Sequence, residues 1–200
     1  MITTGRSDWL LISSLSLVVG ILFVLSLVTG PAAISFLDSL NALFTGRAGA
    51  ASIVMQEIRL PRAILGFLIG ASLGLSGAAL QGYRRNPLAE PGGLGMSASA
   101  SLGAVIAIYT GLSAVFSLAL PLFAFAGAVI AVLLVRFLAG SGAATITLIL
   151  AGVAVTSFAG AMTALALNLS PNPFSALEIV FWMLGSLKDR SMTHVWLALP

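Results

Sequence analysis

Long stretches of this sequence carry no acidic or basic side chain, and that feature limits the chain to one kind of fold. Only 8% of the 200 residues are charged and 59% are hydrophobic, whereas an ordinary soluble domain has roughly 25% charged residues. An apolar helix of about 20 residues crosses the hydrocarbon core of a bilayer. We therefore expect an all-α membrane protein with candidate spans at 9–30, 63–82, 94–109, 114–135 and 145–167.

The first of these segments follows a single basic residue, Arg6, as the core of a secretory signal also does. From Trp9 to Gly30 the segment covers 22 residues, while a signal core is usually about 7 to 15 residues long. Its length favours an uncleaved first span.

Two connections between the segments are long enough to carry short helices. SFLDSLNALF, residues 35–44, places its apolar side chains near one helical face, which is typical of a helix lying at a membrane interface. SPNPFSALEIVFWMLGSL, residues 170–187, opens with prolines and ends in Gly-Ser, which favours a half-length or re-entrant helix. Residues 193–200 begin another apolar segment, so we expect five to six spans and part of a longer bundle.

Small residues recur at every fourth position in the second and fifth segments. Such a ridge lets helix backbones approach closely, and in lipid this packing takes the place of a hydrophobic driving force between helices. We expect structural packing faces at Gly66, Gly70 and Gly74 in the second segment, and at Gly152 and Gly160 in the fifth.

Residue types that are rare or missing exclude several functions. No Asp, Glu, Lys or Arg lies inside the five segments, which argues against a proton relay or a voltage sensor. The chain has no cysteine and a single histidine, His194, so we expect no metal site. Its net charge of +3 comes from a few surplus arginines, and nucleic acid is not an expected partner.

Two short motifs resemble those of serine hydrolases. GASLG at 70–74 contains Ser72, and GLSG at 74–77 contains Ser76. A nucleophilic serine needs a base within hydrogen-bond reach, and a nucleophile elbow needs a turn between a strand and a helix. Both serines are expected in mid-helix, and His194 is the only available base. Accidental matches in a glycine-rich helix are the better interpretation.

The basic residues do not fix the topology of the chain. With the N-terminus in the cytoplasm, four arginines lie inside and five basic residues lie outside, so the positive-inside rule nearly balances. Outer arginines at 47, 59 and 62 can anchor the chain at the interface by snorkelling. They can equally pair with the carboxylates of an acidic partner, and the residues alone leave the two interpretations open.

Three segments in order resemble a known family. They are RLPRAILGFLIGASLGLSGAALQGYRRNPLAEPGGLGMSASASLGAV (59–105), LILAGVAVTSFAGAM (148–162) and FWMLGSL (181–187). With these motifs the chain is similar to the FecCD family of membrane permeases in bacterial ABC importers for iron-siderophores, haem and cobalamin. The likeness runs from Arg59 onward, and the first span fits by position.

The resemblance implies a multi-pass subunit of the bacterial inner membrane with ten spans. Residues 1–200 would be the N-terminal portion of one permease domain, its N-terminus in the cytoplasm, without the C-terminal half and the coupling helices that contact the ATPase. Expected partners are a second permease copy or paralogue, ABC ATPase subunits and a periplasmic binding protein. ATP and Mg would bind the ATPase, so this chain is expected to hold no cofactor and to be no enzyme.

The resemblance also implies roles for individual residues. In relatives the arginines of R-L-P-R stand at the periplasmic mouth and pair with glutamates of the binding protein, which assigns docking to Arg59 and Arg62. N-P-L-A-E-P lies on the cytoplasmic side and narrows the pathway, which places Asn86 and Leu88 at the inner gate. Thr145 matches a small polar gate position, although Ile146 follows it where relatives often have a serine.

Two other classes of function stay open beside the importer permease. A secondary transporter or channel subunit would share the composition, and an intramembrane serine protease would use the serine motifs. Within the permease class the sequence does not identify the cargo; we expect a ferric siderophore before cobalamin or haem, because it is the commonest cargo of the family.

Overall fold

Helices form all the regular structure in the part of the chain that the structure describes. A computed structural model describes residues 6–30, 34, 38, 41–42, 49–84, 87, 90, 92–170, 172–188 and 190–199. In chain order its elements are α1 (Arg6–Val28), α3 (Ala50–Ile53), the π-helix η1 (Val54–Arg59), α4 (Leu60–Arg84), the 3-10 helix η2 (Gly92–Leu94), α5 (Met96–Tyr109), α6 (Leu112–Val115), α7 (Ala119–Ala139), α8 (Thr145–Asn168), α9 (Pro173–Leu184) and α10 (Met192–Ala198).

Four helices of the described chain are long and apolar enough to cross a membrane. They are Ser7–Val28, Ala50–Tyr83, Ala119–Ala139 and Thr145–Asn168. These helices confirm the first, second and fifth expected spans and the all-α membrane fold. The fourth span is also present, but it covers Ala119–Ala139 and not 114–135, because residues 112–115 form the separate short helix α6. The interfacial helix expected at 35–44 lies outside the described residues except for positions 38 and 41–42.

The third expected span is a shorter helix than the sequence indicates. Helix α5 has 14 residues, and at 1.5 Å per residue it is about 21 Å long. It begins late because η2 and a left-handed residue, Gly95 with φ 79°, precede it. Helix α9 has 12 residues and starts behind Asn172, whose Oδ1 accepts a hydrogen bond from the Ser175 amide at 2.8 Å. Its length agrees with the expected half-length helix.

The described chain divides into two compact units. One contains residues 1–72 and 187–200, and the other contains residues 73–186. The division falls inside the continuous helix α4. The family resemblance predicts that residues 1–200 belong to one permease domain, and this assignment stays a prediction.

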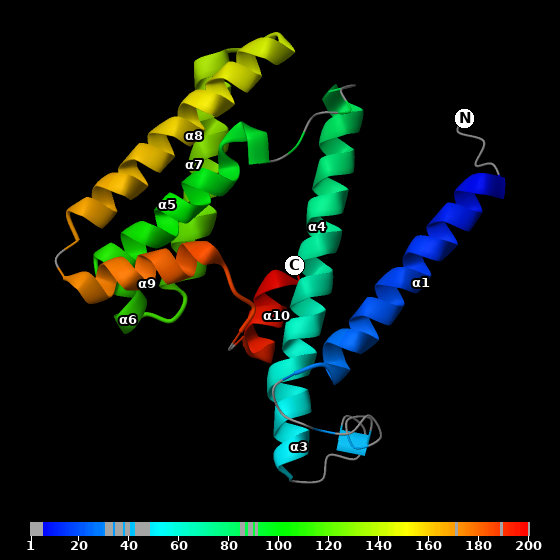
Figure 1. Cartoon of the computed structure of the whole chain (residues 1–200). Helices are drawn as coiled ribbons and strands as arrows, with labels where there is room; N and C mark the ends of the chain where they lie inside the picture. Colours follow the sequence, from blue (N-terminus) through cyan, green and yellow to red (C-terminus); the bar gives the residue numbers. More distant parts are fainter. Residues whose placement is uncertain are drawn as a thin grey trace. The chain divides into compact units, whose positions relative to one another are not determined.

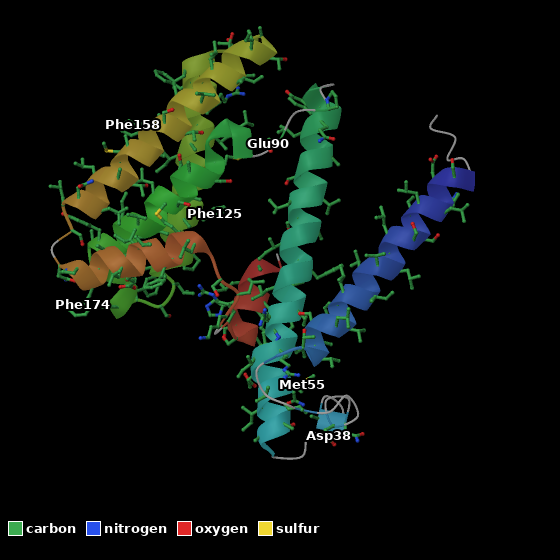
Figure 2. All side chains as sticks on the ribbon, viewed as in Figure 1. Asp38, Met55, Glu90, Phe125, Phe158 and Phe174 are labelled. Atoms are coloured by element: carbon green, nitrogen blue, oxygen red, sulfur yellow. The ribbon has the colours of Figure 1, made fainter. Side chains whose placement is uncertain are left out.

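Helices α5, α7, α8 and α9 build the second unit. Figure 1 shows α8 alongside α5 and α7, and α5 packs against both of them. Where α7 meets α8, the buried cluster consists of Ala131, Val135, Ala151 and Val155. Another cluster joins α5 to α9 through Val105, Ile108 and Ile179. Large side chains such as Phe125 and Phe158, labelled in Figure 2, are exposed on this unit, as expected of helices that face lipid.

The closest helix contact in the second unit is a reciprocal one between backbones. A Cβ atom at Gly103 of α5 would collide with the Phe123 carbonyl of α7, and one at Gly127 of α7 would collide with the Ser99 carbonyl of α5. The pairing of 99 with 127 and of 103 with 123 makes the two helices antiparallel. Only residues without a side chain allow this approach.

In the first unit, α1 meets the rest of the chain at its C-terminal end. Figure 1 shows that end beside the junction of η1 and α4, and Figure 2 labels Met55 there. Met55 is fully buried, and Pro61 is also among the buried residues. The remaining length of α1 is mostly exposed.

Replacing Gly127 by alanine should destabilise the protein, because the new methyl group has to displace the Ser99 carbonyl. We expect Gly127→Ala to lower the free energy of unfolding by about 1 to 3 kcal/mol, the usual cost of overpacking. Gly160→Ala is the control, since a Cβ atom there would meet nothing within 4 Å and alanine favours a helix by up to about 1 kcal/mol. Thermal unfolding in detergent measures both; equal stability of the two variants would contradict the close contact.

Candidate functional site

The arginine motif, residues 59–62, lies at the junction of η1 and α4. Pro61 has no amide hydrogen to donate, and its ring crowds the carbonyl four residues earlier in a regular α-helix. The chain widens into a π turn just before it: the Leu60 amide donates to the Met55 carbonyl, five residues back. Single π turns are frequent at functional sites, and here the turn gives the chain a continuous helix from Ala50 to Tyr83 in spite of the proline.

Arg59, at the end of this π turn, is buried, with 5% of its surface exposed. Its Nη1 donates to the carbonyl oxygens of Leu27 at 3.1 Å and Val28 at 2.9 Å, the last two residues of α1. The same nitrogen lies 3.9 Å from Met55 Sδ. The guanidinium is therefore engaged with the end of α1.

Arg62 is exposed, in contrast to Arg59. It lines a cavity of about 360 Å³ between α1 and α4, and Leu187 is a further lining residue. The other lining residues are Val19, Leu22, Phe23 and Ser26 of α1 and Ala63, Gly66 and Phe67 of α4. Arg62 and Ser26 supply the polar groups of an otherwise apolar wall.

The second predicted site, N-P-L-A-E-P, follows the other end of α4. Asn86 and Leu88 lie outside the described residues, so the gate assigned to them stays a prediction. Pro87 and Glu90 are described and exposed. Glu90 Oε1 lies 3.8 Å from where a Cβ atom would stand at Gly92 or Gly93, so its carboxylate stays near the turn that opens α5.

That turn, Gly92–Gly95, packs directly on α8. A Cβ atom at Gly152 would come within 2.5 Å of the Gly93 carbonyl oxygen, and one at Gly95 would lie 3.0 Å from Val155 Cγ1. Gly95 also needs its positive φ, which other residues rarely adopt. The glycines after N-P-L-A-E-P therefore serve contact with α8 as well as turning the chain.

Thr145 is the first residue of α8 and is exposed. Two helical turns separate it from Gly152, so the predicted gate threonine and the Gly92–Gly95 turn lie toward the same end of α8. A cavity of about 410 Å³ opens beside this end. Its lining residues are Tyr83, Leu94, Val132, Val135, Arg136, Gly140, Ser141, Gly142, Ala143 and Leu148.

The glycines that the sequence predicts as packing positions have different surroundings. Gly152 is in close contact, as described above, and a Cβ atom at Gly66 would lie 3.7 Å from Leu187 Cδ1. Nothing within the described residues comes within 4 Å of such an atom at Gly70, Gly74 or Gly160. Packing by these three glycines stays a prediction.

Two packing glycines are missing from the sequence-based prediction, Gly103 and Gly127. A signal for the first exists, because small residues recur at every fourth position within α5 and just beyond both of its ends: Gly95, Ser99, Gly103, Ala107 and Gly111. The repeat in α7 is weaker, since Phe123 interrupts it. Among the described helices, α5 packs against α7, α8 and α9.

The residues proposed for a serine protease have other hydrogen-bond partners. Ser76 Oγ donates to the Leu73 carbonyl of its own helix at 3.1 Å. His194 lies in the first turn of α10 and forms a capping box with Ser191, whose Oγ is 3.2 Å from His194 Nδ1. No described group of three or more His, Asp or Glu residues is placed to hold a metal ion.

Comparison with known proteins decides the family. The model of the FecCD transport family matches residues 17–200. The chain belongs to the FecCD transport family. This match confirms the resemblance carried by R-L-P-R and N-P-L-A-E-P, and with four apolar helices the chain is a multi-pass membrane protein.

Relatives of known role are permease subunits of importers. The chain is 35% identical over 191 residues to the iron(3+)-hydroxamate import permease FhuG of Bacillus subtilis, covering 92% of this chain and 56% of that protein. It is 37% identical over 189 residues to the vitamin B12 import permease BtuC of Salmonella paratyphi A, covering 94% and 55%. The chain therefore spans about half the length of these relatives.

A solved structure has a similar fold. It is a metal-chelate type ABC transporter in an inward-facing conformation, with a TM-score of 0.72 and 28% sequence identity. The match covers 90% of this chain and 54% of the solved chain. The fold is that of the corresponding half of an ABC permease.

Gly152→Val should loosen the Gly92–Gly95 turn, because the added methyl groups occupy the space of the Gly93 carbonyl. The cysteine-free chain allows a single cysteine at the half-buried Leu94 of the turn to report on it: we expect maleimide to label Leu94→Cys at least about threefold faster when Gly152→Val is also present. Gly160→Val in the same helix is the control. Unchanged labelling in the Gly152 variant would mean that the turn does not depend on this contact.

Proposed function

We propose that this chain is the permease portion of an ATP-driven ABC importer that carries a ferric siderophore across the bacterial inner membrane. The observation that carries the proposal is the family match over residues 17–200, with the arginine motif and N-P-L-A-E-P at opposite ends of one long helix. Together with a second permease copy or paralogue, the chain lines the translocation pathway. The rest of a ten-span subunit supplies the coupling helices.

The nature of the relatives supports the cargo class. FhuG imports iron(3+)-hydroxamate and BtuC imports vitamin B12, and the solved neighbour is of metal-chelate type. All three names describe large metal chelates. Spans with many small residues suit such cargo, because a wide pathway without strong binding groups lets it leave again. A ferric siderophore is the cargo that we propose, with cobalamin and haem as alternatives.

The charge pattern supports an external source of energy. No acidic or basic residue lies within the five apolar segments, so these segments offer no group that would couple uptake to a proton gradient. ATP and Mg bind separate ATPase subunits in this proposal. The chain itself contributes the shape of the pathway and changes between inward-facing and outward-facing forms.

The orientation follows from the two motifs. The N-terminus lies in the cytoplasm, the arginine motif faces the periplasm, and N-P-L-A-E-P faces the cytoplasm. A periplasmic binding protein docks with its carboxylates on the exposed arginine of the motif, a charge pairing that guides association. Asn86, Leu88 and Thr145 narrow the inner end of the pathway.

Uptake by the full-length subunit with its ATPase and binding protein tests the proposal. Labelled ferric siderophore should enter proteoliposomes only when ATP is supplied on the ATPase side, and labelled cobalamin should enter more slowly. Uptake that needs a proton gradient and no ATP would instead indicate a secondary transporter. ATP-dependent uptake of cobalamin alone would support the assignment as an ABC importer and contradict the ferric siderophore as its cargo.

Reversing the charge of Arg62 should weaken docking of the binding protein. Arg62→Glu replaces an attractive pair by a repulsive one at an exposed site, so we expect the affinity for the binding protein to fall at least about tenfold at low salt. Arg136→Glu is the control, because Arg136 lies on the cytoplasmic side in the proposed topology. Binding of the permease in nanodiscs to immobilised binding protein measures both variants; unchanged affinity in Arg62→Glu would contradict docking there.

A bulky residue at Asn86 should block the inner gate. We expect Asn86→Trp to reduce the uptake rate at least about fivefold without changing the affinity for the binding protein, because the two sites lie at opposite ends of α4. Gln81→Trp, five residues earlier in the sequence and at an exposed position of α4, controls for added volume. Normal uptake in correctly folded Asn86→Trp would show that this residue does not narrow the pathway.

A further inference from the structure

We propose that the two arginines of the motif have separate roles: Arg59 anchors the end of the first span, and Arg62 alone presents its charge to a partner. The part that concerns Arg62 rests on the proposed function. The part that concerns Arg59 rests on hydrogen bonds and burial within the first unit.

The end of α1 leaves carbonyl groups that need donors. The last four carbonyls of any α-helix have no partner inside the helix, and a carbonyl that protein covers without a hydrogen-bond donor destabilises the fold. Thr29 satisfies the Leu25 carbonyl through its amide at 2.8 Å and its hydroxyl at 2.7 Å. Arg59 supplies donors to Leu27 and Val28, and its positive charge also suits the negative end of the helix dipole.

The surroundings of Arg59 fit the guanidinium closely. A Cβ atom at Gly30 would lie 2.9 Å from both Nε and Nη2 of Arg59 and 3.1 Å from Cζ. Met55, fully buried, lies against Nη1. Gly30 is needed here for close approach to the guanidinium, and a side chain at that position would push the guanidinium away from the α1 carbonyls.

Arg59 and Arg62 lie close together along the helix, but their side chains differ in solvent exposure. Residues three apart lie on the same side of a helix, yet Arg59 is 5% exposed and Arg62 is exposed. The end of α1 covers one and not the other. A carboxylate that docked on Arg59 would have to displace α1 and leave two carbonyls without their donor, whereas one that docked on Arg62 would not.

Cysteine labelling tests the accessibility of each position in the full subunit. Residues 1–200 contain no cysteine, and any cysteine in the rest of the subunit is first replaced by serine. Arg62→Cys should then react with a membrane-impermeant maleimide at least about tenfold faster than Arg59→Cys, and bound binding protein should protect position 62. Rapid labelling of Arg59→Cys in a subunit that retains the wild-type melting temperature would overturn the anchor.

Conservative and neutral substitutions separate an anchor from a docking charge. Lysine keeps the charge but lacks the planar, five-donor guanidinium. We expect Arg59→Lys and Arg59→Gln to lower the melting temperature alike, by roughly 5 to 10 °C, and to leave the salt dependence of docking unchanged. Arg62→Gln should leave the melting temperature unchanged and reduce the salt dependence, with partial recovery in Arg62→Lys.

Gly30→Val provides an uncharged test of the same contact. It should lower the melting temperature as Arg59→Gln does, and the double variant should be no less stable than the worse single variant, because both remove one interaction. Additive losses would overturn the contact between Gly30 and Arg59. The anchoring role of Arg59 would also be overturned by the following pair of results: Arg59→Lys has the stability of the wild type, and docking is lost in Arg59→Gln but not in Arg59→Lys.

The two halves of the proposal fail in distinguishable ways. If wild-type subunit binds no binding protein at any salt concentration, the proposed function fails, while the labelling rates and melting temperatures still decide the role of Arg59. If docking occurs and Arg59→Gln weakens it with a changed salt dependence, the separation of roles fails and the proposed function stands.

Discussion

A helix end that protein covers has to find partners for its last carbonyls inside the protein, and this requirement organises the first unit. Arg59, which reaches the last two carbonyls of α1, is itself buried, with 5% of its surface exposed. The first span obtains them from Thr29, next to it in sequence, and from Arg59, thirty residues later. The bond joins the end of α1 to the π turn that precedes α4, so the position of the first span depends on the same motif that marks the family.

In the second unit the shared constraint is the approach of backbones. Lipid gives apolar side chains no reason to leave it for another helix, so contact depends on packing. Gly103 and Gly127 let α5 and α7 bring carbonyls against each other's backbone, and Gly152 does the same for the turn before α5. Glycine is used here for its missing side chain in the helices, and for its backbone freedom at Gly95.

The sequence predicts the long spans well because a charge-free run of about 20 residues has few alternatives to a membrane helix. It predicts α5 less well, since composition does not reveal that a left-handed glycine delays its start. The motifs identify the family, yet the burial of Arg59 depends on a contact with α1 that no local pattern contains. Packing glycines are predicted in part: Gly152 is in close contact, whereas Gly103 and Gly127 were not expected. The repeat of small residues offers a signal for Gly103, but Phe123 interrupts the corresponding repeat around Gly127.

Helix α5, with 14 residues, covers only about two thirds of the ~30 Å thickness of a hydrocarbon core. Its connecting turns must therefore make up the remaining depth, and irregular backbone at that depth has to be covered by protein or lie along water. The Gly92–Gly95 turn, pressed on α8, meets the first condition on one side. The other side of the turn cannot face lipid for the same reason, so a further protein surface or a water-filled passage has to adjoin it.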